Sequence, residues 1–306
     1  VLIELNLISW QFLFMMSMLQ GALFSFQLPA RYSFIPKIVP EKFVSNGIAL
    51  LSSGMALVTV FSGSAVGYLY GKYGASNVFL VISLIQLSAL FLALYLPKTE
   101  INNSVSENYI NEMKKSFKYL VGNKMVLAIL LSSLIVSMIA MPVRLQLPII
   151  ARRLYMISPG EIGILLTLAG IGAVIGTLMI STLKKGNLRF VLFLVSAFGL
   201  GFCILIMGLF PYYSVGLIAV IFFGAFEQIR MALSNVLTME YTDKKYRARM
   251  MGFFMLNFAS IPFGALPIGY GVDKIGAVST LKIDAIILII ILLFLLTLSK
   301  SFRKIK

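Results

Sequence analysis

One carboxylate in this sequence stands apart from the other charged residues because it lies deep within an apolar run. Glu227 falls in the stretch 212–231, and Arg230 follows it three residues later. An ionised carboxylate in a bilayer costs about 2.5–3.5 kcal/mol, so it is expected to face a partner or a watery cavity. Residues three apart share one face of a helix. Glu227 therefore either carries a proton or binds a cationic substrate, or it forms a structural ion pair with Arg230 near the end of its helix.

A second group of polar residues lies between two prolines. Arg144 and Gln146 stand in the sequence MPVRLQLP, between Pro142 and Pro148. Proline removes a backbone hydrogen bond, and the freed carbonyl groups can line a cavity inside a membrane protein. Arg144 and Gln146 could therefore bind an anionic or polar substrate. The alternative is that the helix ends early and the long side chain of Arg144 reaches the lipid headgroups.

The composition indicates that these residues belong to a membrane protein. Hydrophobic residues make up 59% of the 306 residues and charged residues only 12%, whereas soluble domains have about 25% charged residues. The net charge of +15 is concentrated in short segments between apolar runs, which indicates topology signals and contacts with anionic lipid rather than nucleic acid. There is no histidine, and the single cysteine, Cys203, lies in an apolar run. We therefore predict no metal site, no cofactor and no enzymatic activity.

The apolar runs predict an all-α integral membrane protein with about nine full transmembrane helices. We expect a truncated N-terminal half-bundle over 1–96, a cytoplasmic amphipathic linker over 97–124, a six-helix half-bundle over 125–299 and a basic cytoplasmic tail over 300–306. The predicted spans are 9–28, 46–70, 76–96, 125–150, 160–183, 188–209, 212–231, 250–271 and 279–299.

Lysine and arginine are distributed unequally between the alternate loops. One set of loops, which includes 29–45, 97–124 and the C-terminal tail, holds 19 of these residues, and the opposite set holds 5. Short loops rich in lysine and arginine stay in the cytoplasm. The sequence therefore predicts a multi-pass protein of the plasma (inner) membrane with a cytoplasmic C-terminus.

A segment near the C-terminus repeats one near the N-terminus. Tyr241–Gly276 aligns with Val39–Gly74 without a gap, and each consists of a basic segment followed by a glycine-bearing span. Repeats of this size indicate a transporter built of two similar halves, although glycine-rich spans can also look alike by composition. The C-terminal half has six predicted spans and the N-terminal half has three. We therefore expect a fragment of a twelve-span protein, with a nine-span protein as the alternative.

The repeated segments supply candidate residues for gating and for helix packing. Three prolines and three cations within 29–45 predict a basic loop, because proline disfavours helix in the residue before it. Glycines four residues apart let helices approach closely, and a smooth packing surface is also compatible with a gating movement. The candidates are Pro29, Arg31, Pro36, Pro40, Asp243, Arg247 and Arg249 in the predicted loops, and Gly63, Gly67, Gly71, Gly264 and Gly269 in the predicted spans.

Both loops resemble those of a known family. The motif P-A-R-x-x-x-x-P-x-x-V-P over 29–40 resembles the loop after the fourth helix in one branch of the major facilitator superfamily, which holds the enterobactin exporter and the macrolide efflux proteins. Asp243 together with 247–249 is similar to the D-x-x-x-R-G-R pattern of that branch, with Ala248 in place of glycine. The run G-S-A-V-G from Gly63 resembles the antiporter motif of the superfamily, but Ser64 replaces the usual proline.

The resemblance covers essentially the whole chain, which would correspond to helices 4–12 of twelve. It implies a secondary active transporter, with proton-coupled efflux of a small amphipathic molecule (a drug, a macrolide or a siderophore-like compound) as the first expectation. Glu227 would lie on the tenth helix, one of the helices that line the superfamily's cavity. The implied partners are the lipid bilayer, a small-molecule substrate and protons, and the implied setting is a monomer in a bacterial membrane. A nutrient importer of the same fold and a non-functional transporter fragment are the alternatives.

Overall fold

Helices make up nearly all of the described part of the chain. The computed structural model describes residues 9–40, 43–95, 109–181, 183 and 186–298, and these contain no strands. Two compact units are present, residues 1–104 and 105–306. Seven of the described helices are long and apolar enough to cross a membrane. The all-α membrane class is therefore confirmed for the described residues, whereas the count of nine spans stays a prediction.

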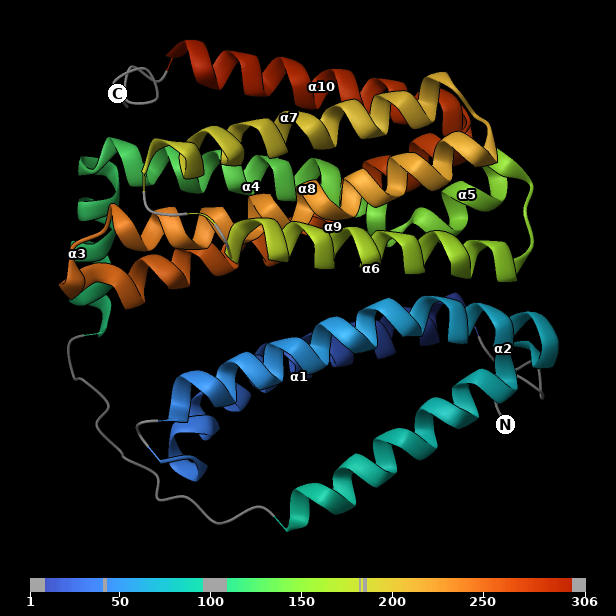
Figure 1. The fold of residues 1–306 in the computed structure, drawn as a ribbon, viewed down its shortest axis with the longest axis horizontal. Helices are drawn as coiled ribbons and strands as arrows, with labels where there is room; N and C mark the ends of the chain where they lie inside the picture. Colours follow the sequence, from blue (N-terminus) through green and yellow to red (C-terminus); the bar gives the residue numbers. More distant parts are fainter. Residues whose placement is uncertain (1–8, 41–42, 96–108, 182, 184–185, 299–306) are drawn as a thin grey trace. The chain divides into compact units, whose positions relative to one another are not determined.

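The described part of the first unit contains two helices, α1 (Trp10–Ile38) and α2 (Val44–Leu94). Figure 1 shows that α2 turns back on itself and forms two arms. The turn is at Gly74, whose φ of 76° lies in the left-handed region that glycine adopts without steric cost. The residue ranges of the two arms, before and after Gly74, nearly coincide with the predicted spans 46–70 and 76–96.

The predicted loop over 29–45 is wrong for most of its length. The backbone of α1 continues through Pro29, Arg31 and Pro36 to Ile38, and only a short segment around Pro40 separates it from α2. Proline is tolerated within membrane helices where neighbouring groups satisfy the freed backbone carbonyls, so it does not by itself end a helix there. The side chains of Pro29, Arg31 and Pro36 lie outside the described part of the chain.

The second unit is a bundle in which α8 contacts four other long helices, α4, α6, α7 and α9. α10 packs mainly against α7, and α4 packs along α9 (Figure 1). The elements are α3 (Tyr109–Gly122), α4 (Lys124–Leu145), α5 (Leu147–Tyr155), α6 (Pro159–Ser181), α7 (Asn187–Leu209), α8 (Tyr213–Glu240), η2 (Lys244–Tyr246), α9 (Arg247–Lys274) and α10 (Ala277–Leu298).

The predicted single span 125–150 is wrong, because the chain breaks at Gln146. Gln146 ends α4 and also precedes the first residue of α5. Pro148 has no amide hydrogen to donate to the carbonyl group of Arg144, four residues earlier, so the helical hydrogen-bond pattern cannot continue unchanged through this point. The sequence indicated the loosening but not the full break.

α8 is longer than the predicted span 212–231. It continues to Glu240, so Arg230 lies ten residues inside the helix rather than near its end. The last turn is held by an ion pair of 2.5 Å between Glu240 and Arg189 of α7. This partly shielded pair keeps a charged helix end attached to its neighbour.

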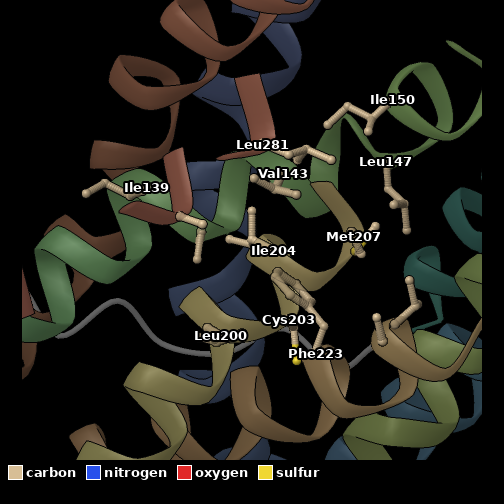
Figure 2. Packing of buried hydrophobic residues seen from close by; sticks show 14 of the residues in the cluster. Ile139, Val143, Leu147, Ile150, Leu200, Cys203, Ile204, Met207, Phe223 and Leu281 are labelled. Carbon is tan, nitrogen blue, oxygen red and sulfur yellow. The ribbon is translucent and has the colours of Figure 1, made fainter. Parts of the chain in front are cut away.

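The largest hydrophobic core cluster of the second unit takes side chains from every helix from α4 to α10. Figure 2 shows Leu200, Cys203, Ile204 and Met207 of α7 among apolar side chains from α4, α8 and α10. All four side chains are buried. Burial of apolar surface inside the bundle, at interior packing density, holds α7 and fixes the position of α8 beside it.

Glycine lets α6 and α8 approach each other closely. A Cβ atom at Gly172 of α6 would overlap the backbone carbonyl oxygen of Ile221, and one at Gly224 of α8 would overlap that of Ala169. The overlap is reciprocal, so neither helix could carry a larger residue at these positions without moving away. Small residues at membrane helix interfaces have this role in general.

α3 belongs to the second unit and packs against α4 and α9. Its Tyr119 ring stacks on Tyr246 of η2, with the ring centroids 4.1 Å apart. Asn123, which follows α3, donates a hydrogen bond of 3.0 Å to the carbonyl oxygen of Tyr241. The predicted amphipathic segment is thus fixed, from Tyr109 onward, to the connection between α8 and α9. Residues 97–108 and the basic tail lie outside the described part.

The two repeated segments have the same local geometry. In each, a lysine lies over the ring of the tyrosine four residues before it, and a left-handed glycine follows two residues after the lysine; φ is 76° at Gly74 and 83° at Gly276. The lysine–ring distances are 5.6 Å for Lys72 and Tyr68 and 6.0 Å for Lys274 and Tyr270. The repeat therefore extends from residue types to backbone dihedral angles, which composition alone does not explain.

Candidate functional site

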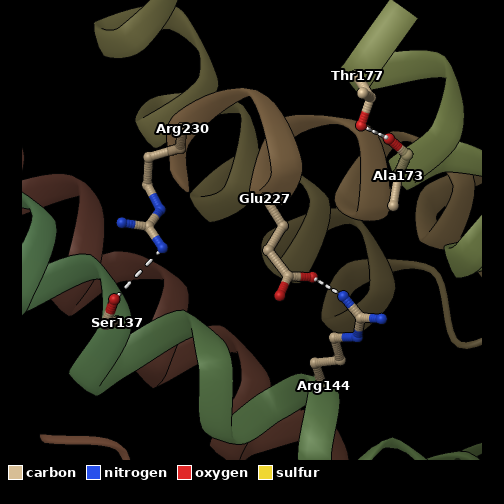
Figure 3. Close-up of polar contacts among 6 residues, drawn as sticks. All are labelled: Ser137, Arg144, Ala173, Thr177, Glu227 and Arg230. Carbon is tan, nitrogen blue, oxygen red and sulfur yellow. Dashed lines mark hydrogen bonds and ion pairs between the residues drawn. The ribbon is translucent and has the colours of Figure 1, made fainter. Parts of the chain in front are cut away.

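The most buried ion pair of the described residues joins α4 and α8. The guanidinium of Arg144, in the last turn of α4, donates to the carboxylate of Glu227 in the middle of α8 (Figure 3). The Glu227 side chain is 6% exposed and that of Arg144 is 26% exposed. The carboxylate is therefore shielded, while the guanidinium still reaches accessible space.

One of the two alternatives for Glu227, a structural ion pair with Arg230, is wrong, because the carboxylate pairs with Arg144. Arg230 turns towards α4, where its Nη1 group donates to Ser133 Oγ at 2.9 Å and its Nη2 group donates to Ser137 Oγ at 3.3 Å. Figure 3 shows Glu227 between the two arginines and bonded to Arg144. Residues three apart share a helix face, but the partner on the neighbouring helix decides which way each side chain turns.

Sequence reasoning missed the serines of α4. Ser133, Ser137 and Arg144 are spaced by four and seven residues, which places them on one face of the helix. Asn257 of α9 was also missed, although it too is a polar residue inside an apolar span, and it is buried. The helical spacing of polar residues in an otherwise apolar run is the signal that could have found the serines.

Gln146 connects the helix break to α9. Its amide nitrogen donates a hydrogen bond of 2.6 Å to the carbonyl oxygen of Ala265. A Cβ atom at Gly269 would lie 3.5 Å from the side-chain oxygen of Gln146, whereas one at Gly264 would overlap the carbonyl oxygen of Met138 in α4. Gly264 thus allows α4 and α9 to touch, and Gly269 has more space around it.

The first set of predicted packing glycines lies in α2. Gly63 and Gly67 are buried and Gly71 is exposed. Their spacing places Gly63 and Gly67 one helical turn apart, as the prediction requires. They belong to the first unit, whereas the ion pair belongs to the second.

The second predicted gating segment is well ordered by hydrogen bonds. The amide N–H of Asp243 donates to the Tyr119 hydroxyl at 2.9 Å, and Arg247 Nε donates to the carbonyl oxygen of Thr242 at 3.3 Å. Arg249 lies 6.0 Å from the ring of Tyr246. Arg247 and Arg249 belong to the first turn of α9 rather than to a loop.

Arg144 and Glu227 form a shielded electrostatic contact between α4 and α8. A carboxylate and a guanidinium in such a place can separate or pair as the carboxylate gains or loses a proton. Within the described residues, no three carboxylate or thiol side chains lie close enough together to hold a metal ion. The chemistry that the Arg144–Glu227 pair offers is a change of charge and of partner.

Comparisons with known proteins indicate the family to which the chain belongs. The profile of a family described as transmembrane secretion effectors matches residues 1–304. No curated protein matches the chain. Because the family match covers almost all of the 306 residues, the chain belongs to the transmembrane secretion effector family of the major facilitator superfamily and is a membrane transporter rather than an enzyme.

Proposed function

We propose that this protein is a proton-coupled exporter of a small amphipathic molecule in a bacterial plasma membrane, with the Arg144–Glu227 pair as its coupling element. The observation that carries the proposal is a shielded carboxylate paired across two helices. The motif over 29–40 supports placing the protein near the enterobactin and macrolide exporters. The substrate would be a drug, a macrolide or a siderophore-like compound.

Proton uptake by Glu227 would weaken the contact between α4 and α8. A neutral carboxyl group holds a guanidinium much less strongly than a carboxylate does. Arg144, released from its partner, can turn towards accessible space and bind a polar group of the substrate. The break at Gln146 lies two residues away, so α4 can shift while the hydrogen bond from Gln146 to Ala265 keeps the break attached to α9.

The proposed coupling is tested by measuring proton movement when substrate is transported. The full-length protein is reconstituted in vesicles that contain a pH-sensitive dye, and erythromycin or ethidium serves as the probe compound. Antiport predicts that a probe gradient drives protons in the opposite direction, in proportion to the probe that moves. Probe movement without any proton flux would rule out the coupling while leaving transport intact.

A nutrient importer of the same superfamily is the second candidate, because a fold does not determine the direction of transport. Inside-out membrane vesicles energised to an acidic interior separate the two functions. An exporter accumulates the probe in such vesicles, whereas an importer driven by proton symport does not.

We expect the C-terminal part of the chain to have α3 in the cytoplasm and the α7–α8 connection outside. The reason is the excess of lysine and arginine on the side of α3. With Cys203 replaced by alanine as background, Tyr212→Cys should react with a membrane-impermeant maleimide in intact cells. Lys115→Cys should react only after the cells are opened. Both positions are exposed, so the reverse labelling would overturn the orientation.

A further inference from the structure

Arg230 is a buried cation that no carboxylate of the described residues contacts directly. It is 1% exposed, and its hydrogen bonds go to the hydroxyls of Ser133 and Ser137 and to the carbonyl oxygen of Ser133. Among the described residues, its Nε group has no hydrogen-bond partner. A guanidinium has five N–H donors, and an unsatisfied one in a low-dielectric interior is costly.

The buried charges around Arg230 do not cancel. Arg144 and Arg230 carry two positive charges, and Glu227, which is bonded to Arg144, carries one negative charge. The other charged residues of α4, α8 and α9 lie in the terminal turns of these helices. Among the three helices α4, α8 and α9, one positive charge therefore remains without a carboxylate, and an uncompensated charge inside a bundle is expensive.

A small cavity of about 10 Å³ lies beside the guanidinium, between α4, α8 and α9. Ser133, Ser137, Arg230 and Asn257 contribute the polar part of its lining, and no carboxylate lines it among the described residues. Asn257 is 5% exposed, and its side-chain oxygen also lacks a hydrogen-bond partner in the part of the chain that the structure describes. A space of this volume holds one particle of about the size of a water molecule.

We propose that this cavity binds one small monatomic anion of the chloride type. The guanidinium supplies the opposite charge and a free Nε–H donor, and the two serine hydroxyls can turn to donate as well. Asn257 can present its amino group by rotation of the amide. A water molecule would fit the space but would not neutralise the charge, and a carboxylate or phosphate group would need the helices to move apart. The site does not depend on the proposed direction or coupling of transport.

Thermal unfolding of the purified full-length protein at constant ionic strength tests the proposal. Sodium gluconate is replaced stepwise by sodium chloride or sodium bromide. A bound ion stabilises the folded state, so the unfolding midpoint should rise by a few degrees and saturate, with gluconate as the inert reference. A change in the unfolding midpoint that does not saturate and that is equal in all salts would contradict a specific site.

Substitutions of residues at and near the cavity should change its affinity for chloride in opposite directions. Arg230→Met should remove the chloride response, and Ser137→Ala should raise the half-saturating concentration several-fold. Glu227→Gln should lower that concentration several-fold, because the local excess charge rises from one to two. Arg153→Gln is the control, since Arg153 pairs with Asp273 at the exposed end of α9 and should leave the response unchanged.

The position of the ion is checked with bromide in crystals of the protein, where an anomalous peak is expected between Arg230 and Ser137. If Arg230→Met does not fold, the opposite shifts in Ser137→Ala and Glu227→Gln still decide the outcome. Chloride binding that is the same in both variants as in the parent protein would overturn the proposal. Loss of proton coupling in Glu227→Gln with tighter chloride binding would leave both proposals standing.

Discussion

Replacing Glu227 by glutamine should abolish transport driven by a pH gradient and preserve the exchange of labelled erythromycin between the two sides of the membrane. Glutamine has nearly the size of glutamate and can still accept a hydrogen bond from Arg144, but it cannot release a proton. The step that links proton movement to substrate movement would therefore be lost, while binding and the return of the loaded protein would remain. Both rates are measured in the same vesicles, with and without the gradient.

Glu240→Gln is the matched control, because it makes the same substitution in the same helix. Glu240 pairs with Arg189 at the end of α8, in a more exposed position than Glu227. We expect gradient-driven transport to remain close to that of the parent protein. If Glu227→Gln still responds fully to the gradient, Glu227 has no part in coupling. If Glu227→Gln instead lowers only the unfolding temperature, the Arg144–Glu227 pair is structural.

Replacing Gly172 by alanine should strongly destabilise the second unit. The new methyl group would collide with the backbone carbonyl oxygen of Ile221, and a backbone atom cannot move aside as a flexible side chain can. α6 and α8 would have to separate, which would also disturb the neighbours of Glu227 on α8. Overpacking typically costs about 1–3 kcal/mol, so we expect a lower unfolding temperature and less folded protein in the membrane.

Gly160→Ala provides the comparison within α6. The nearest atom to a Cβ at Gly160 is the Ser158 hydroxyl oxygen at 3.9 Å, so the methyl group has room. Alanine is also a better helix former than glycine, so a neutral or slightly stabilising effect is the expected result. Equal loss of stability in both variants would show that the close approach of α6 and α8 is not what Gly172 provides.

The sequence contained enough information for the helices but not for their side-chain partners. The long apolar runs over 160–183 and 188–209 predicted α6 and α7 to within two residues at each end, because a membrane span needs a fixed length of apolar chain. The prediction of a loop over 29–45 was wrong because it applied the helix-breaking effect that proline has in water-soluble proteins. In a membrane helix the cost of ending the backbone hydrogen bonds is larger, so α1 continues.

For the site, the sequence indicated the charged residues but not how they pair, and the reason is a different one. Glu227, Arg144 and Arg230 were recognised because charge in an apolar run is expensive wherever the chain folds. The pairing of Glu227 with Arg144 joins residues 83 positions apart, and it depends on the packing of α4 against α8, which no local pattern contains. Arg230 was considered as a partner of Glu227 because a sequence shows the spacing of residues along one helix but not which helix lies beside it.

The short turn at Gly276 also has a consequence for the insertion of the protein into the membrane during synthesis. Only Ile275 and Gly276 separate α9 from α10, and so short a connection makes the two helices antiparallel neighbours as soon as they form. α9 contains Asn257 and two prolines and is the less apolar of the pair, whereas α10 is strongly apolar. During synthesis the two can enter the bilayer as one hairpin, so that the insertion of α10 carries α9, with its polar residue, across the membrane.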